Sequence, residues 1–291
     1  MADRFATLTF ERAVAAPVEM LWQAWVTPGA RALWSAPSPE VTVDYLSHAT
    51  KVGEREISLC KVEGEPLVQV DAGWLALEPN ARSVNYEVVS SEGSTMSAAL
   101  VTADFQAAGA GSQITVSVQL SSLAQDMADG YRHGFGGGLA NLADLAARCM
   151  TISRTIKAPV STVWGAWVNS DTLPQWWGPD GFSCKTRWID LRTGGDWLFD
   201  MIAPDGTVFP NHHRYVRVEP CKRIAYTLLW GENGPKHADA WVEFADVAGG
   251  TEVTLGMAMA TAKEWAEAKG FGAEALGLQT LGKLARFVGA S

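Results

Sequence analysis

Residues 158–179, APVSTVWGAWVNSDTLPQWWGP, have a close counterpart in residues 16–37, APVEMLWQAWVTPGARALWSAP. The Ala-Pro pair, the two tryptophans after it, a third tryptophan and the last proline all recur at a constant offset of 142. Proline suits the first turn of a helix, where its missing N–H needs no partner. Tryptophans three residues apart give such a helix one apolar face. Each copy is therefore predicted to contain a helix after the Ala-Pro pair and a short second helix.

The repeat continues along the chain with small shifts in offset. The further matches are Glu78-Pro79 with Glu219-Pro220 (offset 141), Gly111-Ser112 with Gly250-Thr251 (139) and Gly134-Phe135-Gly136 with Gly270-Phe271-Gly272 (136). Ordered matches with short insertions indicate two copies of one domain, which we assign to residues 1–149 and 150–291. Because no linker rich in Pro, Gly or Ser joins them, we expect an intramolecular pseudo-dimer with a pseudo-two-fold interface.

The second copy has the clearer pattern of secondary structure. Its pattern predicts a strand at 150–156, helices near 158–168 and 171–177, and a final helix from about Ala273 to Val288. Between them lie six strand-like runs, at 184–191, 197–202, 208–218, 223–230, 238–244 and 252–260. A long helix can cover one face of a curved antiparallel sheet. In the first copy, the glycine-rich run Gly134–Gly138 is expected to be a loose segment leading into the long helix.

Particular residues give the second half a family resemblance. They are Arg154-Thr-Ile-Lys-Ala-Pro159, Gln175-Trp-Trp-Gly-Pro179, Asp190-Leu-Arg-Thr-Gly-Gly-Asp-Trp197, Pro204-Asp-Gly206 and Val218-Glu-Pro220. With this order of elements they resemble the START-like (SRPBCC) helix-grip superfamily, and within it the homologues of the activator of the heat-shock-protein-90 ATPase. The first half is diverged and lacks the Asp-Leu-Arg-x-Gly-Gly turn. The resemblance implies an α+β fold with two tandem helix-grip (START-like) domains, each a curved antiparallel sheet wrapped around a long C-terminal helix.

The resemblance also implies an apolar cavity between the long helix and the sheet. Members of the superfamily bind lipids, hormones or polyketides, so we expect non-catalytic binding of a small hydrophobic or amphipathic ligand. We expect it mainly in the second domain, which holds nine of the 13 tryptophans. The residues predicted to line the cavity are Trp197, Phe199, Met201, His213, Tyr215, Val242, Met257, Met259, Phe271 and Leu278. The alternative for the same residues is a close-packed core without a void.

Two other classes of function stay open. A cyclase- or hydrolase-like enzyme acting in the cavity would need inward ionisable groups, for which His213, Tyr215 and Asp200 are the candidates. The sequence favours a binding protein over an enzyme, and no catalytic residue is assigned. The family name suggests a co-chaperone or protein-interaction module with a chaperone partner. The chaperone activators, however, carry a different N-terminal domain where this chain has the diverged copy.

Composition argues against several kinds of partner and site. Lys plus Arg total 23 against 32 for Asp plus Glu, and the net charge of −9 disfavours nucleic acid as a partner. No apolar run approaches the roughly 20 residues of a membrane span, and the N-terminus lacks the pattern of a secretory signal. The four cysteines lie far apart, which is typical of reduced thiols in a cytoplasmic protein. Adjacent His212 and His213 would point to opposite faces of a strand and could not both bind one metal ion, so no metal is expected. No cofactor is expected either.

Overall fold

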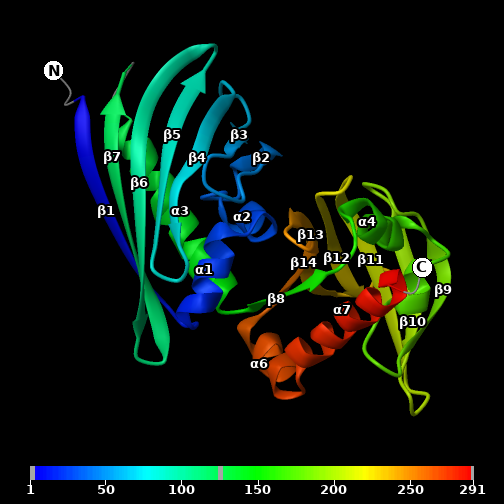
Figure 1. Cartoon of the computed structure of the whole chain (residues 1–291). Helices are drawn as coiled ribbons and strands as arrows, with labels where there is room; N and C mark the ends of the chain where they lie inside the picture. The colour runs from blue at the N-terminus through cyan, green and yellow to red at the C-terminus, as the bar shows by residue number, and fades with distance from the viewer. Residues whose placement is uncertain (1–3, 124–126, 290–291) are drawn as a thin grey trace. The chain divides into compact units, whose positions relative to one another are not determined.

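The computed structural model describes residues 4–123 and 127–289. The chain forms two compact units, Met1–Ala147 and Arg148–Ser291, hereafter unit 1 and unit 2. Within the described ranges, each unit begins with a strand and two helices and continues with six further strands before its long helix (Figure 1). The expected architecture of two tandem helix-grip domains is confirmed. The expected pseudo-two-fold interface stays a prediction.

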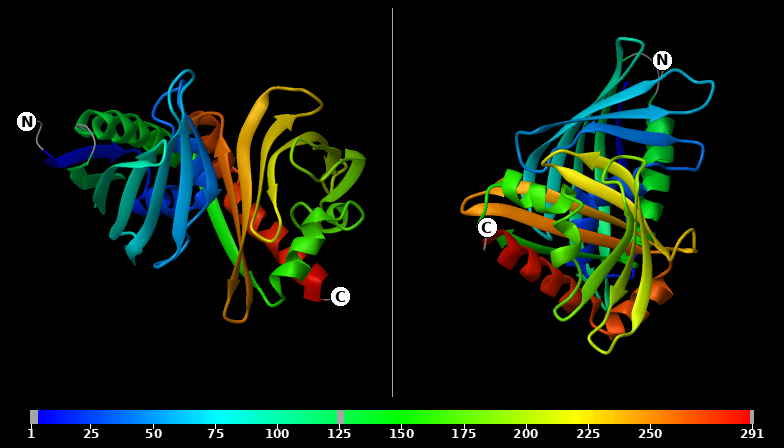
Figure 2. Two further views of the ribbon diagram at one scale, coloured as in Figure 1. Left: turned by 90° about the horizontal axis from the view of Figure 1, so that it is seen from above. Right: turned by 90° about the vertical axis from the view of Figure 1, so that its right-hand side faces the viewer.

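Unit 1 is built on an antiparallel sheet with the strand order β1-β7-β6-β5-β4-β3-β2. Its elements are β1 (Phe5–Val14), α1 (Val18–Val26), α2 (Pro28–Trp34), β2 (Thr42–Ser47), β3 (Arg55–Lys61), β4 (Val68–Glu78), β5 (Arg82–Ser91), β6 (Ser94–Ala108), β7 (Gly111–Ser122) and α3 (Ala128–Ala146). The long helix α3 lies along one face of the sheet and also contacts both short helices (Figures 1 and 2). Strict alternation on β7 buries Ile114, Val116 and Val118 completely, at 0% exposure, on the face toward the core.

Unit 2 repeats this plan with the strand order β8-β14-β13-β12-β11-β10-β9. Its elements are β8 (Cys149–Ile156), α4 (Val160–Val168), α5 (Leu173–Trp176), β9 (Ser183–Ile189), β10 (Asp196–Ile202), β11 (Val208–Glu219), β12 (Arg223–Trp230), β13 (Lys236–Val247), β14 (Gly250–Met259), α6 (Ala262–Gly270) and α7 (Ala273–Gly289). Helix α6 is an addition that the sequence prediction missed. The signal for it is the Thr-x-x-Glu spacing of a capping box, since the Thr261 hydroxyl accepts a 3.1 Å hydrogen bond from the backbone N–H of Glu264.

Both units use the same hydrogen bonds to fix their first helices. The Trp34 indole Nε1 donates to the Ala24 carbonyl at 2.8 Å, and Trp176 donates to Ala166 at 3.0 Å. The hydroxyl of Ser112 donates to the carbonyl of Ala16 at 2.7 Å, as Thr251 does to Ala158 at 2.8 Å. The repeated letters of the sequence therefore mark positions with the same structural role.

One of the matched stretches has different structures in the two units. Gly134–Gly136 lies inside α3, whereas Gly270–Gly272 lies at the junction of α6 and α7. The expectation that Gly134–Gly138 is a loose segment is therefore wrong. Tertiary packing holds this part of α3 helical despite its glycines: a Cβ at Gly137 would collide with the Pro37 carbonyl oxygen, and Asn141 donates a hydrogen bond to Ala36 at 2.7 Å.

Replacing Thr251 by valine should lower the free energy of unfolding of unit 2 by about 1–3 kcal/mol, because the Ala158 carbonyl would lose its hydrogen bond beside a fully buried side chain. Thr251→Ser keeps the hydroxyl and should cost less than half as much. Urea unfolding followed by circular dichroism measures both variants. Equal destabilisation by valine and serine would contradict the role assigned to this hydroxyl.

Candidate functional site

Unit 1 contains a cavity of about 380 Å³ between α3 and the strands β3, β4 and β5. Most of its wall is apolar, and the apolar lining residues include Trp25, Trp34, Val43, Val70, Val89, Val101, Phe135 and Leu139. The volume lies within the range of roughly 300–1,000 Å³ that is usual for small-molecule sites. The sequence led us to expect the cavity in the other half of the chain.

Missing side chains on α3 make room for this cavity. Gly130, Gly134 and Gly138 follow one another at four-residue spacing, so they share a helix face, and all three line the cavity. A Cβ at Gly130 or Gly134 would meet no other atom within 4 Å. Glycine in a helix interior costs roughly 1 kcal/mol relative to alanine. The three glycines therefore lower the stability of α3 while they leave this space open.

Some inward side chains of the sheet in unit 1 are also smaller than those of unit 2. Strand pairing shows which positions of the two sheets correspond. Glu56 on β3 lies opposite Ala72 on β4, and Trp197 on β10 lies opposite His213 on β11. The two pairs are related by an offset of 141, which is also the offset of the hairpin residues Glu78 and Glu219 at the ends of β4 and β11. Corresponding positions of the two sheets can therefore be read directly from strand pairing.

At six positions of the cavity wall, unit 1 has a small or polar residue where unit 2 has a larger apolar or aromatic one. By this register, Glu56, Ser58, Cys60, Ala72, Asn85 and Glu87 of unit 1 correspond to Trp197, Phe199, Met201, His213, Tyr226 and Leu228 of unit 2. The fold is the same in both units, but the volume of the inward side chains differs. The smaller side chains at these six positions contribute to the open interior of unit 1.

Aromatic rings fill the interior of unit 2. Trp197 and Phe199 are both 0% exposed and stack with ring centroids 3.8 Å apart. The His213 ring meets both of them edge-on and stacks on Tyr226 at 4.3 Å. Burial in this apolar setting lowers the pKa of His213 to about 3. Its neighbour His212 points away from this cluster and lies 2.6 Å from Asp196.

The other predicted lining residues of unit 2 divide into two groups. Tyr215 and Val242 lie in the same core, with Met201 and Met257 packed against it, and Met259 is buried outside that cluster. Phe271 is 69% exposed and Leu278 is 39% exposed, so the assignment of these two to the interior is corrected. Phe271 caps α6, and α7 turns a different face inward, formed by Leu281, Leu284 and Val288.

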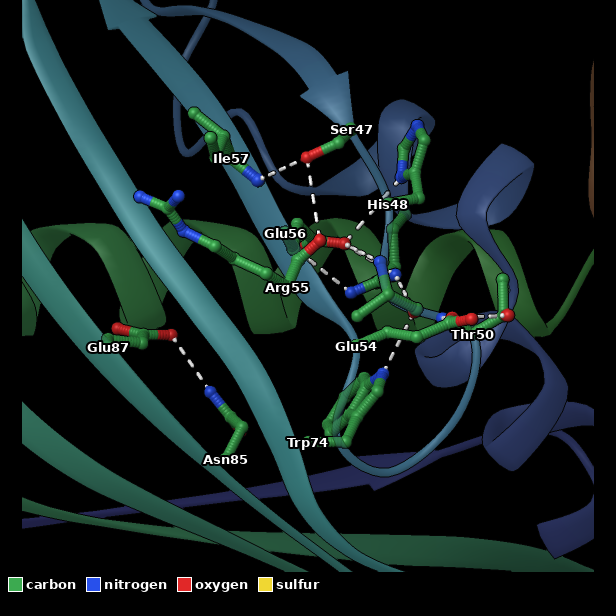
Figure 3. Close-up of polar contacts among 12 residues, drawn as sticks. Ser47, His48, Thr50, Glu54, Arg55, Glu56, Ile57, Trp74, Asn85 and Glu87 are labelled. Atoms are coloured by element: carbon green, nitrogen blue, oxygen red, sulfur yellow. Dashed lines mark hydrogen bonds and ion pairs between the residues drawn. The ribbon is translucent and has the colours of Figure 1, made fainter.

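A buried ion pair fixes the polar part of the cavity in unit 1. Arg31 from α2 donates to Glu56 Oε1 at 2.9 Å and lies 2.6 Å from Oε2. The same guanidinium donates to the Ala49 carbonyl at 2.9 Å, which also accepts the indole N–H of Trp74 at 3.0 Å. Figure 3 shows Glu56 and Trp74 in this network. Mutual pairing offsets the desolvation of both charges, so this part of the wall is close to neutral.

Glu87 is the acid in this cavity without such a partner. Its carboxylate accepts one hydrogen bond, from the Asn85 side-chain amide at 3.4 Å (Figure 3). In the described part of the chain, no cationic side chain forms an ion pair with it. Burial, with a smaller contribution from the charge of Glu56, raises the pKa of Glu87 to about 7. Tyr131 on α3 also lines the cavity, and burial together with the charge of Glu87 raises the pKa of its hydroxyl.

Sequence reasoning missed all of these residues of unit 1. One usable signal was the presence of acids at inward positions of alternating strands, as in Arg-Glu56-Ile-Ser58 and Asn85-Tyr-Glu87. The other signal was the four-residue spacing of glycines in a helical segment. Neither pattern identifies a site by itself. The strand register is needed to show that these residues surround the same space.

Glu87→Gln should stabilise unit 1 at pH 8 by up to about 3 kcal/mol and have little effect at pH 4. The folded state raises the pKa of Glu87 from 4.5 to about 7, so it binds the proton more tightly than the unfolded chain. Stability is therefore lost as the pH rises from about 4.5 to about 7, and glutamine removes that loss. Urea unfolding at both pH values measures it. A variant less stable than wild type at pH 8 would contradict this account.

Known proteins of similar structure match about half of the chain. Among curated proteins no sequence matched the chain. Among solved structures, proteins from Nitrosomonas europaea, Rhizobium loti and Mycobacterium smegmatis match with identities of 24%, 26% and 22% and TM-scores of 0.44, 0.43 and 0.47. The matches cover 50%, 48% and 50% of this chain and 96%, 95% and 94% of the other proteins.

The described residues include no helix both long and apolar enough to cross a membrane.

Residues 157–289 match the model of the family described as Activator of Hsp90 ATPase homolog 1-like protein. That stretch covers nearly all of unit 2 and includes the Gly-Gly turn and the Glu-Pro hairpin that suggested the resemblance. Unit 2 is thus similar in sequence to the Activator of Hsp90 ATPase homolog 1-like family, and unit 1 has the same fold.

Proposed function

We propose that unit 1 binds a small amphipathic molecule in the cavity between α3 and the sheet. The observation that carries the proposal is the combination of an open apolar volume of about 380 Å³ with a few polar groups gathered on one part of its wall. Apolar walls supply affinity in such sites, and a small number of placed polar groups fixes the orientation of the ligand. Arg31, Glu56, Asn85 and Glu87 are those groups in unit 1.

The proposal moves ligand binding from unit 2, where the sequence led us to expect it, to unit 1. Four of the residues nominated in unit 2 occupy corresponding positions, and three of these four, Trp197, Phe199 and His213, have rings that pack against one another. A ligand in that interior would have to displace Trp197 or Phe199, both of which are fully buried. Displacing such a side chain would forfeit several kcal/mol of packing, on the order of the cost of a large-to-small core substitution.

A co-chaperone or other protein-interaction role is the second proposal, and it concerns unit 2. Its support is the filled interior of that unit together with the family description. The enzyme alternative has less support, because His213 and Tyr215 lie within a packed aromatic core. A general acid or base must come within hydrogen-bond reach of a substrate, and both of these side chains are buried among aromatic rings.

Gly134→Leu should weaken the binding of a neutral apolar dye, 1-N-phenylnaphthylamine, by at least tenfold. The new side chain would extend into the open space that a Cβ at this position faces. Gly136→Leu is the matched control, because a Cβ there also meets no atom within 4 Å but the residue does not line the cavity. Both variants gain the same helix propensity, so a difference between them reports the cavity.

Fluorescence titration of the dye into the full chain measures both variants. We expect binding by Gly136→Leu within about twofold of wild type, since residues two apart in a helix lie on nearly opposite faces. Equal binding by the two variants would place the dye outside this cavity and contradict the proposed function.

A further inference from the structure

We propose that Glu87 makes the cavity of unit 1 selective for ligands that carry a cationic amine on an apolar body. The inference rests on the proposed function and names the class of molecule that the same cavity would take. Its basis is the position of one acid, with a single weak hydrogen bond, in a mostly apolar wall whose other acid, Glu56, is paired with Arg31.

The charges around the cavity do not balance without a ligand. Arg31 is held by Glu56 and by the Ala49 carbonyl, so its charge is already compensated. Glu87 has no comparable partner among the residues that the structure describes. The other ionisable residues that line the cavity are Tyr45 on β2, Cys60 on β3, and Tyr131 and His133 on α3. With Tyr45, Cys60, Tyr131 and His133 in their neutral forms, an ionised Glu87 leaves the wall with an acid that a cation would neutralise.

The donors and acceptors in the wall favour an amine over other head groups. An ionised carboxylate can only accept hydrogen bonds, and the Asn85 amide supplies one donor at 3.4 Å. A protonated amine brings up to three N–H donors together with the opposite charge. A carboxylate ligand would meet like charge in a poorly solvated space, and an alcohol would offer one donor without charge.

The effect of ionised Glu87 on the stability of unit 1 also favours a cationic ligand. An unpaired carboxylate in an apolar wall opposes folding once it ionises, as the raised pKa of Glu87, about 7, expresses. A bound amine would supply the missing charge and favour the ionised form. Amine affinity should therefore rise as the pH increases from 6 to 8, because Glu87 ionises across this interval while an alkylamine stays protonated.

Displacement of 1-N-phenylnaphthylamine from the full chain by decylamine, decanol and decanoate tests the inference. These probes share one alkyl chain and differ in the head group. At pH 8 we expect decylamine to bind at least tenfold more tightly than decanol, as a charge-assisted hydrogen bond would provide, and decanoate to bind most weakly. At pH 6 the advantage of the amine should shrink.

Glu87→Gln should reduce the amine-to-alcohol preference to less than threefold at pH 8, because decylamine loses its charged partner. Glu63→Gln is the control for long-range charge, because Glu63 is exposed in a turn. Equal affinity of the wild type for decylamine and decanol would overturn the inference and leave the proposed function standing. Failure of every probe to displace the dye, or binding insensitive to Gly134→Leu, would overturn the proposed function with it.

Discussion

The long helix of a helix-grip unit cannot lie flat on a curved sheet, so side chains or a ligand must occupy the space between them. Unit 2 fills it with stacked and edge-on rings around His213, and unit 1 leaves part of it open. The backbone plan is shared down to the hydrogen bonds from Trp34 and Trp176 to the preceding helix. The two units therefore share a fold and differ in the volume of the side chains at a few inward positions.

Polar contacts join the elements that surround the open interior of unit 1. The Arg31–Glu56 pair ties α2 to β3, and the Ala49 carbonyl joins this pair to Trp74 on β4. These contacts hold the wall of the cavity where packing alone cannot, because no side chain fills the centre. Ionised Glu87 instead lowers the stability of unit 1, because burial disfavours its charged form. A group that costs stability inside a cavity is most simply explained by what the cavity binds, because local conflicts with folding concentrate at functional sites.

Much of the fold could be predicted from the sequence because it depends on local patterns. The Ala-Pro and Trp spacings located the helices, and alternation located the strands and showed which residues of β10 and β11 share a face. The cavity was expected in unit 2 because abundance of tryptophan was taken as a sign of cavity walls, whereas the structure has a cavity of about 380 Å³ in unit 1. Large rings at inward positions meet one another and close the interior, as Trp197 and Phe199 do. Which inward residues share a space depends on the register between strands, and Glu56 and Glu87 become neighbours of one cavity only through β4.

The titration of the Glu87 carboxyl carbon, followed by ¹³C NMR in the full chain and assigned by comparison with Glu87→Gln, tests the central claim most directly. The account predicts a midpoint at a pH of about 7 without ligand and a clear displacement to lower pH when decylamine saturates the cavity. A midpoint near the ordinary value of 4.5, unchanged by decylamine, would show that Glu87 is solvated and that the cavity does not hold the amine.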